Sequence, residues 1–147
     1  MALARDEVVM TAGRENLAYV LTTAVTAYSG ALLGLDMATG LAVLWSDTAG
    51  VLFLGLNLAK KIGNAAGTPP IEVEVNCTGP VEKKATVSGV ASIANVGDLV
   101  YATDDNTLTL TPTINVGPIG EVTRWYVGTT CDVKLFTPDE YRAWGGF

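Results

Sequence analysis

The chain has 147 residues, of which 49% are hydrophobic and only 16% are charged, and it contains 16 glycines. This composition is too apolar for a disordered chain, and its glycine, threonine and valine content argues against a helical bundle. The length is that of one domain with a core of its own.

Basic residues are few and scattered along the sequence, and the formal net charge is −6. Nucleic acids and anionic membrane surfaces both attract clustered basic residues, so we expect neither as a partner. Histidine is absent, which removes the commonest general base, the commonest zinc ligand and every Ser-His or Cys-His pair. We therefore expect no enzyme, no cofactor and no metal site.

The first 28 residues carry few turn signals and little clean periodicity, which predicts an N-terminal arm over residues 1–28. We expect its apolar side chains to bind a partner, and the candidates are Val8, Val9, Met10, Leu17 and Tyr19. The uncharged run 17–35 is long enough to span a bilayer, but threonine, serine and glycine dilute it and no basic cluster flanks it. Acidic residues precede any apolar stretch at the N-terminus, so we expect no signal peptide and synthesis in the host cytoplasm.

Two Asp-to-Gly turns, at 36–40 and 47–50, separate three apolar segments between Ala31 and Ala59. Such spacing is typical of β-hairpins, so this region predicts a meander of short strands. The apolar runs are unbroken, which predicts strands covered on both faces, and a neighbouring subunit is one possible cover.

Strict alternation of apolar and polar residues over 71–77 predicts a half-solvated strand, and a weaker strand follows at 83–88. Two further strands, at 116–127 and 131–136, close the sheet. The alternation breaks near Arg124 and Trp125, which indicates a bulge or an intersubunit contact. Cys77 and Cys131 both fall on apolar strand faces, so they are read as buried thiols, with a disulfide between neighbouring strands as the alternative.

The segment Asn95 to Pro112 reads as strand, polar turn and strand. Its turn holds Asp104, Asp105 and Asn106, which bond to their own backbone and tolerate turn conformations. A calcium loop would need more acidic ligands and a closing glutamate, and a catalytic carboxylate pair would need a concave site. Hairpin tips are convex, so we expect these acids to turn the chain.

The last eleven residues predict a short helix, with Thr137 as its cap, Pro138 at its first position and Glu140 completing a capping box. Tyr141 and Trp144 then share one face. This helix either packs on its own sheet or forms a docking tail, and Trp125, Tyr126, Tyr141 and Trp144 join the partner-binding candidates.

The hairpin and the strands after it resemble the small decoration (cement) proteins of tailed-bacteriophage capsids. A hairpin of the form G-x-x-V-Y-x-x-D-D-x-T-x-T and a following V-G-x-x-x-E-V strand carry the resemblance, which spans about residues 30–136. The matching positions are Gly97, Val100, Tyr101, Asp104, Asp105, Thr107 and Thr109, then Val116 and Gly117, and more loosely Gly120, Glu121 and Val122. The C-terminal extension and the long apolar N-terminal segment depart from the family's pattern.

The resemblance implies an all-β fold with a compact β-sandwich or β-tulip-like body, which we place at 29–136 between the arm and a C-terminal tail at 137–147. It also implies a homotrimer on the exterior of the virion capsid, at three-fold and quasi-three-fold positions. There the major capsid protein would be its partner and the trimer would stabilise contacts between capsomers. No catalytic residue is implied.

Three other interpretations remain open. The first is another virion structural part, such as a head-fibre base, a tail-tube subunit or an adaptor. The second is a carbohydrate-binding module, which would use Trp45, Trp125 or Tyr126 to stack on sugar rings. A hydrolase using Asp104 and Asp105 ranks last.

Overall fold

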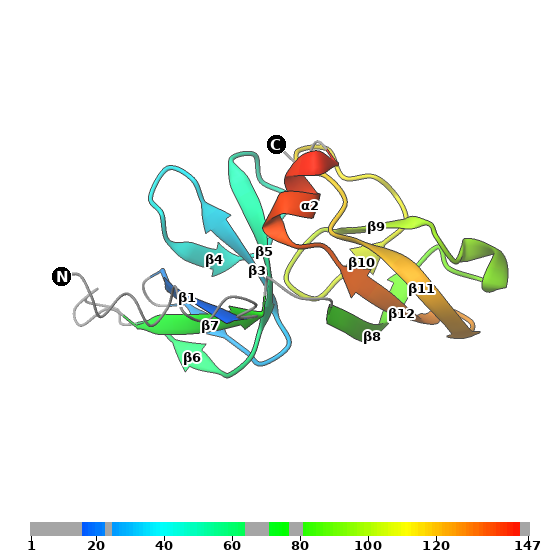
Figure 1. Cartoon of the computed structure of the whole chain (residues 1–147), viewed down its shortest axis with the longest axis horizontal. Helices are drawn as coiled ribbons and strands as arrows, with labels where there is room; N and C mark the ends of the chain where they lie inside the picture. Colours follow the sequence, from blue (N-terminus) through cyan, green and yellow to red (C-terminus); the bar gives the residue numbers. More distant parts are fainter. Residues whose placement is uncertain (1–15, 23–24, 64–70, 77–80, 145–147) are drawn as a thin grey trace.

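The computed structural model describes residues 16–22, 25–63, 71–76 and 81–144. Strands dominate these ranges and one short α-helix follows the last strand, so the expectation of an all-β fold is confirmed (Figure 1). Two β units lie side by side, an N-terminal unit up to residue 76 and a C-terminal unit from residue 81. None of the helices in the described ranges has the length and apolar character needed to cross a membrane.

The N-terminal unit is built on a five-stranded sheet in the order β1-β7-β5-β3-β4, with every strand antiparallel to its neighbours. Its strands are β1 (Asn16–Val20), β3 (Leu32–Asp36), β4 (Ala42–Leu44), β5 (Val51–Asn57) and β7 (Glu72–Asn76), and a separate pair is formed by β2 (Thr26–Ala27) and β6 (Lys61–Ile62). The alternation predicted around β7 is confirmed, because Val73 and Val75 are buried and Glu72 is exposed.

The turn between β3 and β4 follows its sequence signal. The Asp36 carboxylate accepts from the Ala38 N–H at 2.9 Å, and Gly40 takes a φ of +74° that glycine adopts without strain. The second predicted hairpin is wrong, because β4 and β5 do not pair and instead flank β3 on opposite sides. After β4 the large Trp45 ring lies in the core between the two units. The chain then crosses to the other side of β3, where β5 pairs with it.

Both faces of the central strands are covered by the chain itself. Phe53 belongs to the core shared with the C-terminal unit, whereas its neighbour Leu54 belongs to the core of the N-terminal unit. The latter core consists of Leu21, Ala27, Leu33, Ala42, Leu54, Val73 and Val75. The predicted burial of β5 on two faces is therefore confirmed without a second subunit.

The described part of the predicted arm lies within the N-terminal unit. β1 pairs with β7 along its whole length, and Leu21 bridges to Ala42 of β4, so this segment links the two edges of the sheet. Leu21 is buried, as is Ala27 in β2. An arm extending to residue 28 is therefore not confirmed, and residues 1–15 lie outside the described ranges.

The C-terminal unit is a closed barrel in the order β10-β8-β12-β11-β9. Its elements are β8 (Val81–Ser88), the 3-10 turn η1 (Ile93–Asn95), β9 (Leu99–Ala102), β10 (Leu108–Thr109), β11 (Gly120–Val127) and β12 (Thr130–Leu135). The predicted hairpin is present, with β10 shorter than expected, and β10 also pairs in parallel with β8, which closes the barrel. Register shifts on both sides of Arg124 and Trp125 confirm the predicted bulge.

The predicted alternation in β12 is also confirmed, since Cys131, Val133 and Leu135 are all buried. Cys131 is a free thiol inside the barrel, and burial raises the pKa of its thiol. Cys77 lies outside the described ranges.

Helix α2 (Pro138–Ala143) begins with the predicted capping box. The Thr137 hydroxyl accepts from the Glu140 N–H at 3.2 Å, and the Glu140 carboxylate accepts from the Thr137 N–H at 2.9 Å. The helix lies on β5 between the two units (Figure 1). Tyr141 enters the shared core, with its ring centroid 5.6 Å from that of Trp45 and 6.1 Å from that of Phe53. The helix thus packs on its own sheet.

Candidate functional site

The tip of the β9–β10 hairpin is ordered by one carboxylate. Asp104 accepts from the Asn106 N–H at 2.9 Å, from the Thr107 N–H at 2.7 Å and from the Thr107 hydroxyl at 2.9 Å. The backbone bond from Asn106 is the largest cause that holds the pKa of Asp104 below its ordinary value. The interpretation of Asp104 as a turn residue is confirmed by these contacts.

The hairpin tip also joins the two units. The Leu32 N–H donates to the backbone carbonyl of Asp105 at 2.9 Å, and the Asp47 N–H donates to that of Thr103 at 3.3 Å. The expectation that the tip is only convex is wrong. Asp105 and Asn106 border a hollow, because the tip packs against the N-terminal unit.

Lys83 of β8 lies at the centre of this junction. Its Nζ donates to the Gly30 carbonyl of the N-terminal unit at 2.8 Å. One hollow of about 300 Å³ is lined by residues 28–31 together with Lys83, Asp105 and Asn106, and another of about 380 Å³ is lined by Lys83, Lys84, Ala85, Thr86, Asn106 and Thr130. Because the hollows share Lys83 and Asn106, they adjoin, and together we call them the Lys83 cleft.

Burial lowers the pKa of Lys83, and the nearby Asp105 carboxylate offsets only part of this effect. The sequence contains a local signal that marks Lys83 as an unusual residue. Side chains alternate along a strand, so Lys83 had to share a face with Ala85 and the buried Val87. A lysine on the apolar face of a strand is an unusual residue that needs a partner or a ligand.

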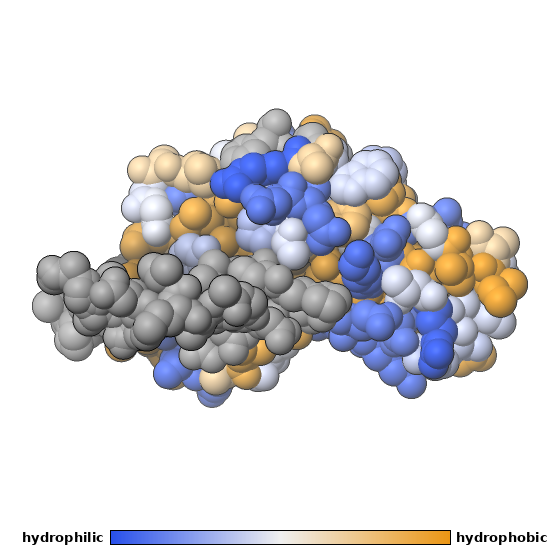
Figure 2. Space-filling model, viewed as in Figure 1, coloured by the Kyte–Doolittle hydropathy of each residue, from blue (hydrophilic) through white to orange (hydrophobic). Residues whose placement is uncertain are grey.

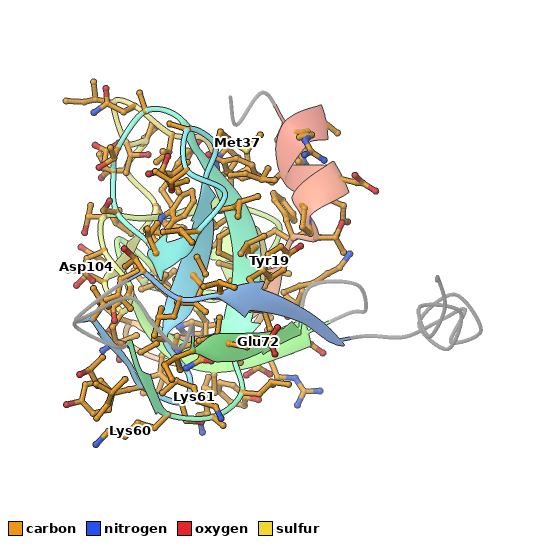
Figure 3. The ribbon with its side chains drawn as sticks, turned by 90° about the vertical axis from the view of Figure 1, so that its left-hand side faces the viewer. Tyr19, Met37, Lys60, Lys61, Glu72 and Asp104 are labelled. Atoms are coloured by element: carbon orange, nitrogen blue, oxygen red, sulfur yellow. The ribbon has the colours of Figure 1, made fainter. Side chains whose placement is uncertain are left out.

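The fold gathers basic residues that are scattered in the sequence. Lys60 Nζ lies 5.1 Å from the ring centroid of Tyr28, which lines the cleft. At the other end of the cleft, Lys84 Nζ lies 4.6 Å from the ring centroid of Tyr126, and Arg124 lies 5.9 Å from the same ring. Figure 3 shows Lys60 and Lys61 together at the lower end of the N-terminal unit. Lys83 and Lys84 therefore line the cleft, and Lys60 contacts a tyrosine that lines it.

The lining of the Lys83 cleft is rich in hydrogen-bond donors. The described ranges contain no group of three or more His, Cys, Asp or Glu side chains that could hold a metal ion. Lys83, Lys84, Asn106 and two threonine hydroxyls instead offer hydrogen-bond donors along one open surface. Donors of this kind hold carboxylate or phosphate oxygens without a covalent step.

The predicted partner-binding residues of the N-terminal segment fall into two groups. Val8, Val9 and Met10 lie outside the described ranges. Leu17 and Tyr19 lie in β1, where Leu17 pairs with Val75 and Tyr19 pairs with Val73. Tyr19 is half-buried and packs against the core of the N-terminal unit (labelled in Figure 3), so much of its surface is already used within the chain.

The predicted aromatic candidates of the C-terminal unit also differ in how far they are buried. Tyr141 is fully buried, and its hydroxyl accepts from the Gly117 N–H at 3.2 Å, so it serves the fold. Trp144 is 53% exposed and stacks on Phe136 with 6.1 Å between ring centroids. Trp125 is half-buried and donates from Nε1 to the Gly128 carbonyl at 3.0 Å. Tyr126 is more exposed, and its hydroxyl donates to the Asp132 carboxylate at 2.7 Å.

Sequence patterns missed a group of exposed aliphatic side chains. Ile93 is 73% exposed, Val127 is 68% exposed and Ile114 is 91% exposed. Figure 2 shows hydrophobic surface at the right-hand end of the C-terminal unit, over the loop that carries η1. No strand or helix period marks these residues, because they lie in turns and at a strand end.

Trp45 is buried and donates from Nε1 to the Ala102 carbonyl at 2.9 Å, which removes it as a sugar-stacking residue.

Comparison with protein-family models, with curated proteins and with solved structures returned no match for this chain. Its function is therefore inferred from its residues and their geometry.

Proposed function

We propose that this protein is a virion structural protein that decorates the capsid of a tailed bacteriophage. In this proposal it binds the outer surface of the expanded capsid as a homotrimer, at three-fold and quasi-three-fold positions, after synthesis in the host cytoplasm. Its partners are the major capsid protein and two further copies of itself. It acts by binding and involves no catalytic residue, no cofactor and no nucleic acid.

The observation that carries the proposal is the β9–β10 hairpin. This segment bears the motif that resembles the decoration proteins, and Asp104 at its tip makes the turn that the motif requires. In this fold the hairpin also joins the two β units. We include in the proposal that these two packed units correspond to the β-sandwich or β-tulip body of that family.

Surface composition supports the same function. A protein that holds neighbouring capsomers together needs a rigid framework and apolar contact surface. The large hydrophobic side chains exposed in the described ranges are Tyr28, Met37, Leu58, Ile62, Ile93, Val96, Ile114, Tyr126, Val127 and Trp144. They are spread over both units, as contacts with several neighbours would require.

The mechanism would be thermodynamic. A protein that binds the assembled lattice and not its separated subunits stabilises the lattice by mass action. Three linked copies engage several capsid subunits at once, so weak single contacts become tight through effective concentration. Stabilisation therefore depends on the match between the spacing of the trimer and that of the lattice.

Addition of the purified protein to undecorated, expanded capsids of its own phage tests the proposal. We expect saturable binding and a higher temperature of capsid disruption. Absence of binding to these capsids at micromolar concentration would contradict the proposal.

The second candidate is another virion structural subunit, such as a head-fibre base, a tail-tube protein or an adaptor. The two candidates differ in symmetry, so native mass spectrometry of the protein at high concentration separates them. A trimer supports decoration, whereas a hexamer supports a tail component.

A further inference from the structure

We propose that the Lys83 cleft binds an extended, carboxylate-rich segment of a partner protein. The cleft lies where the two β units meet, and both of them contribute to its walls. The inference rests on the proposed function only in naming the capsid protein as the partner. The site itself is argued from the charges and donors of this chain.

The donors in the cleft match the acceptors of a carboxylate. Lys83 and Lys84 supply ammonium groups, Thr86 and Thr130 supply hydroxyls, and Asn106 supplies an amide. The two threonines pair directly across β8 and β12, so their side chains lie on the same face of the barrel. Two adjoining hollows provide more length than a single small anion needs, which favours an extended segment over an isolated ion.

The charges around the cleft favour a negative ligand. Two lysines and one carboxylate, Asp105, line it, and Lys60 lies at its edge against Tyr28. On the outer face of the barrel, Asp132 pairs with Lys84 across β8 and β12 and accepts from Tyr126, whose ring Arg124 also contacts. Glu82 shares this face of β8 with Lys84 and accepts from the Thr123 hydroxyl at 2.6 Å. The residues that line the cleft thus carry two positive charges and one negative charge, in a chain whose net charge is −6.

Lys83 is half-buried at the junction and keeps donors that a ligand can use. Within the described ranges, one of its three N–H bonds is donated to the Gly30 carbonyl. Burial lowers the pKa of Lys83, and the nearby Asp105 carboxylate offsets part of this effect. A ligand carboxylate that enters the cleft supplies the missing negative charge, so binding restores the interaction that burial removed.

The acidic character of the whole molecule limits the class of ligand. A long polyanion such as nucleic acid would extend beyond the cleft and meet the repulsion of the surrounding acidic surface. A short acidic peptide fits within the positive region and avoids that repulsion. We therefore favour a protein segment over a nucleic acid.

Fluorescence anisotropy with labelled hexaglutamate tests the inference, with hexaglutamine and a six-nucleotide oligothymidine as comparison probes. We expect the wild-type protein to bind hexaglutamate, to bind hexaglutamine at least about tenfold more weakly, and to lose affinity for hexaglutamate as salt screens the charges. Binding of the oligothymidine as tightly as hexaglutamate would overturn the assignment to an acidic peptide.

Substitutions of a positive and of a negative residue in the cleft should change the affinity for hexaglutamate in opposite directions, which makes the test specific. Lys83→Met should weaken hexaglutamate binding about tenfold, since a charge-assisted hydrogen bond is lost. Asp105→Asn should strengthen binding severalfold, because it removes the carboxylate that competes with the ligand. Arg142→Met on α2 removes one positive charge away from the cleft and should leave affinity unchanged.

The gain expected for Asp105→Asn cannot arise from misfolding, so the inference remains testable even if Lys83→Met is unstable. Equal binding of hexaglutamate and hexaglutamine, or no tightening in Asp105→Asn, would overturn it. Capsid binding separates this inference from the proposed function. If Lys83→Met binds capsids as tightly as the wild type, the cleft is not the docking site, whereas hexaglutamate binding without capsid binding would overturn only the decoration role.

Discussion

Gly34 shows how the packing of neighbouring side chains, first Val51 and then Trp45, can exclude any side chain from one position. It lies in the middle of β3, where a Cβ would overlap Val51 Cγ1 and approach Trp45 Cε3 at 3.1 Å. We expect Gly34→Ala to lower the free energy of unfolding by about 1–3 kcal/mol, as overpacked cores do. Urea denaturation monitored by circular dichroism measures this loss.

Gly40→Ala is the matched control for that prediction. Gly40 has a φ of +74°, and no atom lies within 4 Å of the position that a Cβ would take, so only backbone strain opposes the alanine. Such strain costs about 1 kcal/mol. A loss in Gly34→Ala no larger than in Gly40→Ala would contradict the close packing of Trp45 on β3.

Asp104 makes stability depend on pH at the hairpin tip. Hydrogen bonds from Asn106 and Thr107 favour the charged carboxylate, so the pKa of Asp104 is lower in the folded protein than in the unfolded chain. Its stabilisation is complete above the unfolded value of about 3.9 and is lost as pH falls through the folded pKa.

We therefore expect Asp104→Asn to be less stable than the wild type at pH 7, by at most about 1 kcal/mol because the carboxylate is exposed and screened. The difference should shrink at pH 2.5. Urea titrations at both pH values measure it. A difference that persists unchanged at pH 2.5 would argue against a role for the ionised group.

At the scale of elements, α2 tests whether the C-terminus serves the fold or a partner. Tyr141 is buried against Trp45 and Phe53, whereas Trp144 is largely exposed one turn later. We expect Tyr141→Ala to lower the free energy of unfolding by about 3–5 kcal/mol, because it leaves a cavity in the shared core.

Two further variants complete that test. Tyr141→Phe removes only the hydroxyl that accepts from Gly117, so it should cost about 1 kcal/mol, and Trp144→Ala should cost less than Tyr141→Ala. Thermal melts measured by calorimetry rank the three variants. A melt of Tyr141→Ala close to that of the wild type would show that the helix is not part of the folded core.

Local patterns predicted the elements whose signals are contained in a few neighbouring residues. Alternation located the strand around Val73, the turn chemistry of Asp104 located the hairpin, and Thr137 with Glu140 located the start of α2. Strand pairing depends instead on contacts between distant residues. The pairing of β5 with the far side of β3 and the burial of Trp45 in the shared core are contacts of this kind, which no local period reveals.

The candidate site was hidden for the same reason. Residues 28–31, Lys83 and Asn106 are far apart in sequence, and only the docking of the hairpin tip on the N-terminal unit brings them to one cleft. One signal was nevertheless local, because the alternation of β8 places Lys83 on the same face as Val87. The sequence alone therefore marks Lys83 as an unusual residue, but it does not predict which residues surround its side chain.

At the scale of the whole molecule, the two β units share a core and should behave as one cooperative unit. The Trp45 backbone N–H donates to the Leu32 carbonyl of β3. The Trp45 ring centroid lies 5.2 Å from that of Phe53, and its Nε1 donates to the Ala102 carbonyl of the C-terminal unit. Each face of β5 contributes to a different core, so neither unit can open without exposing part of the other.

We therefore expect the most protected amides of β7 and β12 to exchange hydrogen with the same free energy of opening, equal to that of global unfolding. Native-state hydrogen exchange in increasing denaturant measures both. Trp45→Ala should lower both values together, by about 3–5 kcal/mol, because the ring lies in the joint between the units. If β7 instead opens at a lower free energy and Trp45→Ala affects only β12, the units are independent, and a cleft formed between them would lack the fixed geometry that ligand binding requires.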